Sequence, residues 1–205
     1  VFRHPNLVLG AVTLFFYMGA EVIAGDTIGL FGRELGVTNF GQLTAYTMGF
    51  MMCGYILGLL LIPRVLSQEG ALAASAILGV VLSSMIIGAD TSSTSIWMTF
   101  FGWLGVPAIP NAVLYVAMFG LANALVWPAI WPLALRGLNE AQTGTGSALL
   151  IMGIAGGATL PLLFGAIADA NSDPRTAYWI MLPCYLFVLY YAAAGHKMTQ
   201  WVSKT

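Results

Sequence analysis

The sequence predicts an all-α membrane protein in which six transmembrane helices form a single bundle. Of its 205 residues, 59% are hydrophobic and only 7% are charged, whereas a soluble domain usually has about 25% charged residues. Apolar segments also recur along the whole chain. A secretory signal would give one short apolar region before a cleavage site, so we expect the first segment to be a true span.

The spans follow from length, since a membrane-crossing helix needs about 20 mainly apolar residues. Six segments meet this requirement: 6–32, 41–63, 71–89, 111–135, 146–168 and 176–195. The stretch 93–110 is partly apolar but too short to cross, and it contains Pro107 and Pro110. We expect it to form an insertion at the outer membrane interface.

The orientation follows from the preference of Lys and Arg for cytoplasmic loops. If both ends of the chain are cytoplasmic, five cations lie inside and only two, Arg33 and Arg175, lie outside. The inside set is Arg3, Arg64, Arg136, Lys197 and Lys204. The sequence therefore predicts a multi-pass protein of the bacterial inner membrane with both ends of this segment in the cytoplasm.

Several functional classes are disfavoured by composition and motifs. The net charge is −1, so no basic surface points to nucleic acid. The sequence has no nucleophile elbow, phosphate-binding loop or His-Glu-x-x-His motif, which argues against an enzyme. Cys53 and Cys184 lie in apolar segments without neighbouring His or Cys, so we expect neither a metal site nor a bound cofactor, only a possible coupling proton.

Two carboxylates, Glu21 and Asp26, interrupt the first apolar segment. A charge at the bilayer centre costs about 2.5–3.5 kcal/mol and usually faces a partner or a cavity. On a regular helix the two residues are separated by about 7.5 Å along the axis and roughly 140° around it. Either the backbone opens at Gly25 so that both reach one cavity, or one lines the cavity while the other bonds a neighbouring helix.

A second polar group lies in the fourth segment, where Asn123, Trp127 and Trp131 recur at a spacing of four and so share one helix face. An amide both donates and accepts hydrogen bonds, and an indole face packs on the C–H face of a pyranose. This stripe favours a sugar platform, although the indoles could equally be ordinary packing. Gln42 and Tyr46, early in the second segment, are weaker candidates for contact with substrate.

Four stretches resemble the C-terminal half of the bacterial fucose/glucose/galactose proton symporters of the major facilitator superfamily. They are "GAEVIAGDTIG", "FGLANALVWPAIWPLALRGL", "TGSALLIMGIAGGATLPLLFGAIAD" and "AYWIMLPCYLFVLYYAAAGHK". The resemblance implies one half of a twelve-helix fold, built from two three-helix repeats, with an N-terminal six-helix half as partner and alternating access around a central cavity. It also places the coupling carboxylates of fucose-type members on that other half. The first residue, Val1, likewise suggests a piece of a longer protein.

Together these observations predict transport of a hexose or 6-deoxyhexose, of the glucose, galactose or fucose class, by a secondary-active mechanism coupled to protons, with facilitative transport as the open alternative to coupling. The residues expected to line the sugar path are Glu21, Asp26, Asn123, Trp127, Gln42 and Tyr46, with Glu21 as the candidate for proton coupling. Two alternatives remain open. One is a carrier of another solute, such as a drug or an organic anion, and the other is a structural membrane protein.

Overall fold

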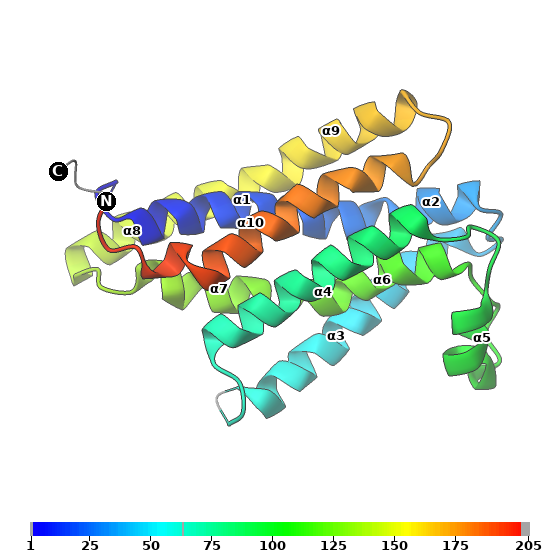
Figure 1. Cartoon of the computed structure of the whole chain (residues 1–205), viewed down its shortest axis with the longest axis horizontal. Coiled ribbons are helices and arrows are strands. Elements are labelled where there is room, and N and C mark those ends of the chain that lie inside the picture. Colours follow the sequence, from blue (N-terminus) through cyan, green and yellow to red (C-terminus); the bar gives the residue numbers. More distant parts are fainter. Residues whose placement is uncertain (1, 63, 202–205) are drawn as a thin grey trace.

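The computed structural model describes residues 2–62 and 64–201, and every regular element in these ranges is a helix (Figure 1). Six helical stretches are long and apolar enough to cross a membrane. They are Pro5–Asp26, Phe40–Leu61, Gln68–Gly88, Asn111–Leu135, Glu140–Asp169 and Thr176–Lys197. The predicted all-α fold with six spans is confirmed. The internal repeat of three helices stays a prediction.

Several spans consist of more than one helix. The α-helices are α1 (Pro5–Asp26), α2 (Ile28–Glu34), α3 (Leu43–Leu61), α4 (Gln68–Gly88), α5 (Ser95–Phe101), α6 (Asn111–Asn123), α7 (Val126–Leu135), α8 (Glu140–Met152), α9 (Gly156–Asp169) and α10 (Met181–Ala193). Short 3₁₀ turns are η1 (Phe40–Gln42), η2 (Gly102–Leu104), η3 (Gly153–Ala155), η4 (Thr176–Ile180) and η5 (Gly195–Lys197). The stretch 93–110 holds α5 and η2, which are shorter than the spans.

Two of the spans are interrupted, and a further helix break follows the first span. α1 ends at Asp26 and α2 begins at Ile28, so the helix breaks at Thr27, whose hydroxyl donates to the carbonyl of Ile23 (2.6 Å). In the fourth span α6 ends at Asn123 and α7 starts at Val126, and η3 separates α8 from α9. Backbone breaks at membrane depth are tolerated where protein or a cavity replaces the lost partners, so these positions mark buried or functional surroundings.

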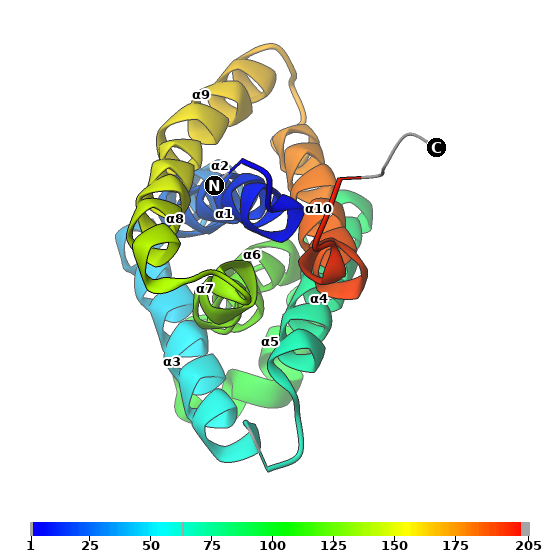
Figure 2. The same cartoon turned by 90° about the vertical axis from the view of Figure 1, so that its left-hand side faces the viewer.

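Two spans occupy the centre of the bundle. Figure 2 shows α1 and the α6–α7 span enclosed by α3, α4, α10 and the α8–α9 span. The burial of the spans agrees, since 72% of the apolar window in Asn111–Leu135 and 50% of that in Pro5–Asp26 is buried, against 22% in Phe40–Leu61. Glu21 and Asn123 therefore belong to the two most central spans.

The Lys and Arg residues are unequally distributed between the two ends of the bundle. The N-terminal segment meets the C-terminal one, because the indole of Trp201 donates to the carbonyl of Phe2 (2.9 Å). The α3–α4 and α7–α8 connections lie at this end, whereas α2 and α5 lie at the opposite end (Figure 1). The first end thus carries Arg3, Arg64, Arg136 and Lys197, and the second carries Arg33 and Arg175. Pro63, in the α3–α4 connection, and Lys204 lie outside the described residues.

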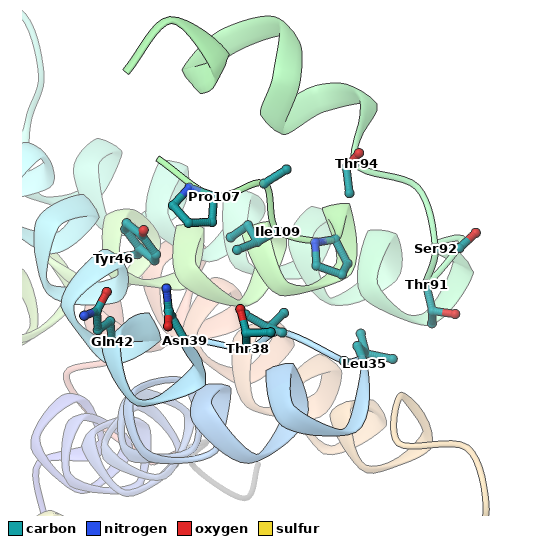
Figure 3. A pocket seen from close by; sticks show the side chains of 14 residues that line it. Leu35, Thr38, Asn39, Gln42, Tyr46, Thr91, Ser92, Thr94, Pro107 and Ile109 are labelled. Atoms are coloured by element: carbon teal, nitrogen blue, oxygen red, sulfur yellow. The ribbon is translucent and has the colours of Figure 1, made fainter. Parts of the chain in front are cut away.

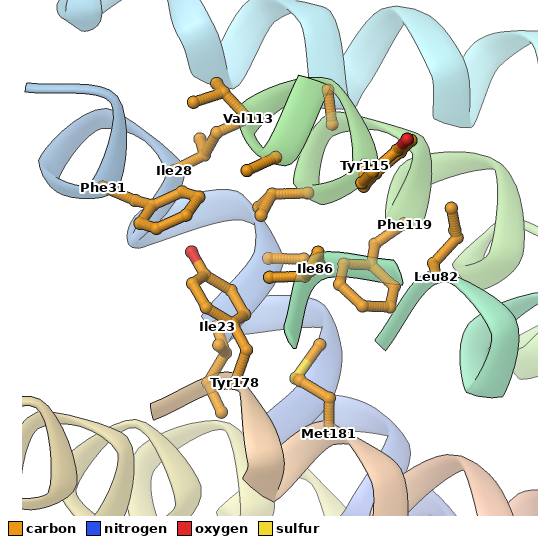
Figure 4. Packing of buried hydrophobic residues seen from close by; sticks show 14 of the residues in the cluster. Ile23, Ile28, Phe31, Leu82, Ile86, Val113, Tyr115, Phe119, Tyr178 and Met181 are labelled. Atoms are coloured by element: carbon orange, nitrogen blue, oxygen red, sulfur yellow. The ribbon is translucent and has the colours of Figure 1, made fainter. Parts of the chain in front are cut away.

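A hydrophobic core joins α1, α2, α4, α6 and the start of the sixth span (Figure 4). The ring of Tyr178 has Phe31 of α2 and Phe164 of α9 at its sides, each with a centroid distance of 5.0 Å and edge-to-face geometry. Such aromatic pairs contribute about 0.5–1.5 kcal/mol beyond the burial of their area. The core therefore fixes α2 and α9 against the same aromatic residue.

Glycine allows the closest helix contacts. A Cβ atom added at Gly156 of α9 would overlap the carbonyl oxygen of Phe15 in α1, and one added at Gly120 of α6 would overlap that of Thr47 in α3. Small residues at membrane helix contacts let backbones approach in this way. Gly165, also in α9, has open space at the Cβ position within the described part of the chain.

This contrast predicts opposite results for two alanine substitutions in one helix. Gly156→Ala should separate α9 from α1 and cost about 1–3 kcal/mol, the usual range for overpacking. Gly165→Ala should leave stability unchanged or raise it by about 0.5–1 kcal/mol, because alanine favours helix. Thermal unfolding of the purified protein in detergent measures both, and equal midpoints for the two variants would contradict the close α1–α9 contact.

Candidate functional site

A buried polar group lies at the centre of the bundle, where α6 ends. The side chain of Asn123 is 0% exposed, and its Oδ1 accepts a hydrogen bond from the hydroxyl of Tyr185 on α10 (2.8 Å). Its Nδ2 is also buried and has no hydrogen-bond partner among the described residues. An unpaired buried donor costs about 1–3 kcal/mol. A buried donor without a partner calls for a specific explanation. A bound ligand that accepts a hydrogen bond from Nδ2 would provide it.

A carboxylate lies near the tyrosine that bonds this amide. Glu21, half-buried on α1, is within electrostatic range of the hydroxyls of Tyr17, Tyr185 and Tyr55, the last of which is 41% exposed. Tyr17 precedes it by one turn on the same helix, while Tyr55 comes from α3 and Tyr185 from α10. Tyr185 is therefore a neighbour of both Glu21 and Asn123. We name these five residues the central cluster.

The central cluster combines complementary hydrogen-bonding groups. A carboxylate accepts hydrogen bonds, an amide N–H₂ donates them, and tyrosine hydroxyls do both. A polyhydroxylated ligand needs this mixture, because each of its hydroxyls donates one hydrogen bond and accepts others. The hydrogen-bonding groups of the cluster are therefore of the kinds that a polyhydroxylated ligand requires.

The second carboxylate of the first span lies apart from the cluster. α1 remains helical through Asp26, and the break occurs at Thr27 rather than at Gly25. The separation of roughly 140° around a regular helix therefore holds. Glu21 is half-buried and Asp26 is exposed. The structure thus has the arrangement in which the two carboxylates do not share one face.

The two tryptophans of the fourth span stack on each other. The rings of Trp127 and Trp131 are 5.5 Å apart with an interplanar angle of 24°, and both side chains are half-buried on α7. Each indole therefore covers part of one face of the other. A sugar ring could pack on the free face of Trp127, which follows Asn123 by four residues.

Gln42 and Tyr46 lie away from the central cluster. They line a cavity of about 280 Å³ between the start of α3 and the stretch 107–110 (Figure 3). Tyr46 also contacts Trp97 of α5 edge to face, with ring centroids 5.4 Å apart. Nine residues of helix separate Tyr46 from Tyr55, about 13.5 Å along α3. Of the residues predicted from the sequence, Glu21 and Asn123 thus belong to the central cluster and Gln42 and Tyr46 to this cavity, which we name the end pocket. Asp26 and Trp127 belong to neither group.

Three members of the central cluster were missed from the sequence. Tyr17 could have been found, since it lies four residues before Glu21 and so on the same helix face. Tyr55 and Tyr185 could not, because only the packing of α3 and α10 against α1 brings their hydroxyls near. Tyr185 is 62 residues from its partner Asn123.

Comparisons with known proteins agree with this picture. The chain is 32% identical over 200 residues to a "Glucose/galactose transporter" of Brucella abortus biovar 1 (strain 9-941), a match that covers 95% of the chain and 43% of that relative. A crystal structure of the E. coli fucose:proton symporter FucP aligns with a TM-score of 0.79 and 19% identity over 94% of the chain and 43% of the symporter. A second FucP structure, in the outward conformation, aligns with a TM-score of 0.76 over 92% of the chain and 42% of that structure. No protein-family model matches the chain.

These similarities bear on the predictions in two ways. They confirm the family resemblance that the motifs indicated, and the related proteins are transporters rather than enzymes. The chain spans less than half the length of the relatives it matches.

The Tyr185–Asn123 hydrogen bond predicts a stability difference within α10. Tyr185→Phe should cost about 1–3 kcal/mol, because it leaves the buried Oδ1 of Asn123 unpaired. Tyr190→Phe, on the exposed side of the same helix, should change stability by less than about 0.5 kcal/mol. Adding Asn123→Leu to Tyr185→Phe should recover most of the loss, since both polar partners are then replaced by apolar groups.

Chemical denaturation of the three variants in detergent provides the comparison. Equal stability of Tyr185→Phe and Tyr190→Phe would show that the buried hydrogen bond contributes nothing.

Proposed function

We propose that this chain, which belongs to the fucose/glucose/galactose transporter family of the major facilitator superfamily, forms one six-helix half of a secondary-active sugar transporter. The substrate is a hexose or 6-deoxyhexose of the glucose, galactose or fucose class. The partner is an N-terminal six-helix half, and the two halves alternate access to the sugar from either side of the bacterial inner membrane.

The observation that carries this proposal is the buried, unpaired amide of Asn123 beside Tyr185 at a helix break. Transporter sites commonly lie near the bilayer midplane, where discontinuous helices free polar groups for the substrate. The amide donates to a sugar hydroxyl or ring oxygen and Glu21 accepts from a neighbouring hydroxyl. Trp127 packs on the C–H face of the ring, and Asp26, at the exposed end of α1, has a lesser part in the path.

Proton coupling follows from the same carboxylate. When Glu21 is ionised it accepts hydrogen bonds from the sugar, and when it is protonated its charge is removed from the centre of the membrane, which lowers the cost of reorienting that site. Sugar and proton binding are thereby linked at one residue.

The membrane orientation is part of the proposal. The end that carries Arg3, Arg64, Arg136 and Lys197 faces the cytoplasm, in line with the distribution of cations. The opposite end, with α2 and α5, faces outward. The insertion 93–110 then lies at the outer interface, where Trp103, 80% exposed, can contact the headgroup region.

The two alternatives fit the central cluster less well. A carrier of apolar drugs would favour an apolar cavity, whereas this centre holds a carboxylate, an amide and three tyrosines. A purely structural polar cluster would be expected to have its hydrogen bonds satisfied, and the Nδ2 atom of Asn123 is unpaired among the described residues.

Uptake of radiolabelled sugar tests the function directly. The chain joined to its N-terminal half, expressed in a host without hexose transporters, should accumulate glucose, galactose or fucose. The chain alone should insert into the membrane and fail to concentrate sugar. Good membrane expression of the joined protein without uptake of any of these sugars would refute the proposal.

Substitution of the two carboxylates separates their roles. Glu21→Gln keeps the shape but loses charge-assisted hydrogen bonds worth about 1 kcal/mol, so sugar affinity should fall about five- to tenfold. Transport should also depend less on external pH, since glutamine does not titrate. Asp26→Asn should reduce affinity less.

Calorimetric titration and uptake at several external pH values measure these effects in the joined protein. A normal affinity and pH profile for Glu21→Gln, at normal expression, would make Glu21 structural. A larger affinity loss for Asp26→Asn than for Glu21→Gln would mean that Asp26, and not Glu21, is the main carboxylate that binds the sugar.

A further inference from the structure

The end pocket lies outside the central cluster, and its lining has chemistry of its own. Two carboxamides, Asn39 and Gln42, lie on the segment that leads into α3, and the hydroxyl of Tyr46 follows one turn later. Figure 3 shows Pro107 and Ile109 on the facing segment. One wall thus offers donors and acceptors, and the other offers an apolar surface.

The walls are held in place by hydrogen bonds that leave the carboxamides free. The Oδ1 of Asp90 accepts from the backbone N–H of Ser92 (2.9 Å) and from its hydroxyl (2.7 Å). The Asn111 side chain accepts from the backbone N–H of Ile96 (3.1 Å) and donates to the hydroxyl of Ser93 (3.0 Å). Asn39 and Gln42 are exposed, and within the described ranges no protein group hydrogen-bonds their side chains, so both amides are available to a ligand.

The charge of Asp90 supports this rigidity. Its hydrogen bonds from Ser92, first the backbone N–H and then the hydroxyl, hold the pKa of the Asp90 carboxyl below its ordinary value. The Asp90 carboxylate accepts both of the hydrogen bonds that hold Ser92 in place.

The lining also limits the charge of the ligand. The residues that line the cavity are all uncharged. A sugar phosphate or an organic anion would find no cation here to pair with, whereas a neutral sugar needs only the amides, the hydroxyls and an apolar face. The volume of about 280 Å³ is near the lower end of small-molecule sites, which suits a single monosaccharide ring.

We infer that the end pocket is a second site for a neutral monosaccharide, separate from the central cluster. Asn39 and Gln42 hydrogen-bond its hydroxyls, and Pro107 packs against its C–H face. The inference rests on the proposed function, in which this end faces outward, and it makes the pocket the first place where an incoming sugar binds. About 13.5 Å of helix separates the two sites along α3, so both can be occupied together.

Binding stoichiometry tests the inference. Equilibrium dialysis of the joined transporter with radiolabelled D-glucose and D-galactose should show two sugars bound per protein at saturation. The double variant Asn39→Ala/Gln42→Ala should bind one, with the affinity of the remaining site unchanged. Asn171→Ala, an exposed amide at the same end but outside the pocket, is the matched control and should still bind two.

The outcomes separate this inference from the proposed function. One sugar per unmodified protein, weakened about five- to tenfold by Glu21→Gln, would leave the function intact and overturn the second site. Two sugars in both the protein and the double variant would also overturn it. No binding of either sugar, or of fucose in the same dialysis, would refute the function and the second site together. Because a stoichiometry of one in the unmodified protein is enough to overturn the second site, misfolding of a variant cannot hide that answer.

Discussion

Contact between helix backbones at glycine is the constraint on which the rest of this structure depends. Gly156 lets α9 lie on the carbonyl of Phe15, and Gly120 lets α6 lie on the carbonyl of Thr47. In lipid there is little hydrophobic force between helices, so close packing of this kind holds them together. The contact at Gly120 also joins α3 to α6, the helices that carry Tyr55 and Asn123 of the central cluster.

The side chains of the central cluster are polar groups that the bundle does not need for its stability. The bond between Tyr185 and Asn123 satisfies one end of the amide and leaves the other unpaired among the described residues. Glu21 adds a carboxylate to the same surroundings. Packing at the glycines offsets the cost of this arrangement, and under the proposed function a sugar pairs the free groups. In that proposal the break between α6 and α7, beside Asn123, is where the fourth span bends as the site opens.

The sequence alone revealed the spans but only part of the site. Hydropathy located all six helices, because length and composition decide what can cross a bilayer. Glu21 and Asn123 were identifiable, since polar groups are expensive in apolar segments. Helix periodicity gives the face and depth of a residue on its own helix, but not the helix that packs on that face. It therefore could not identify Tyr185 as the partner of Asn123, place the break at Thr27 instead of Gly25, or separate Gln42 and Tyr46 from the centre.

The most direct test of the account is the sugar affinity of the joined transporter in which Asn123→Leu is combined with Tyr185→Phe. This pair removes the central amide and its partner together, so no polar group is left stranded in the core. Calorimetric titration with D-glucose and D-galactose should show affinity reduced by about tenfold or more, equivalent to at least about 1.4 kcal/mol, at a melting temperature close to that of the unmodified protein. An unchanged affinity for both sugars would mean that the central cluster does not bind the substrate.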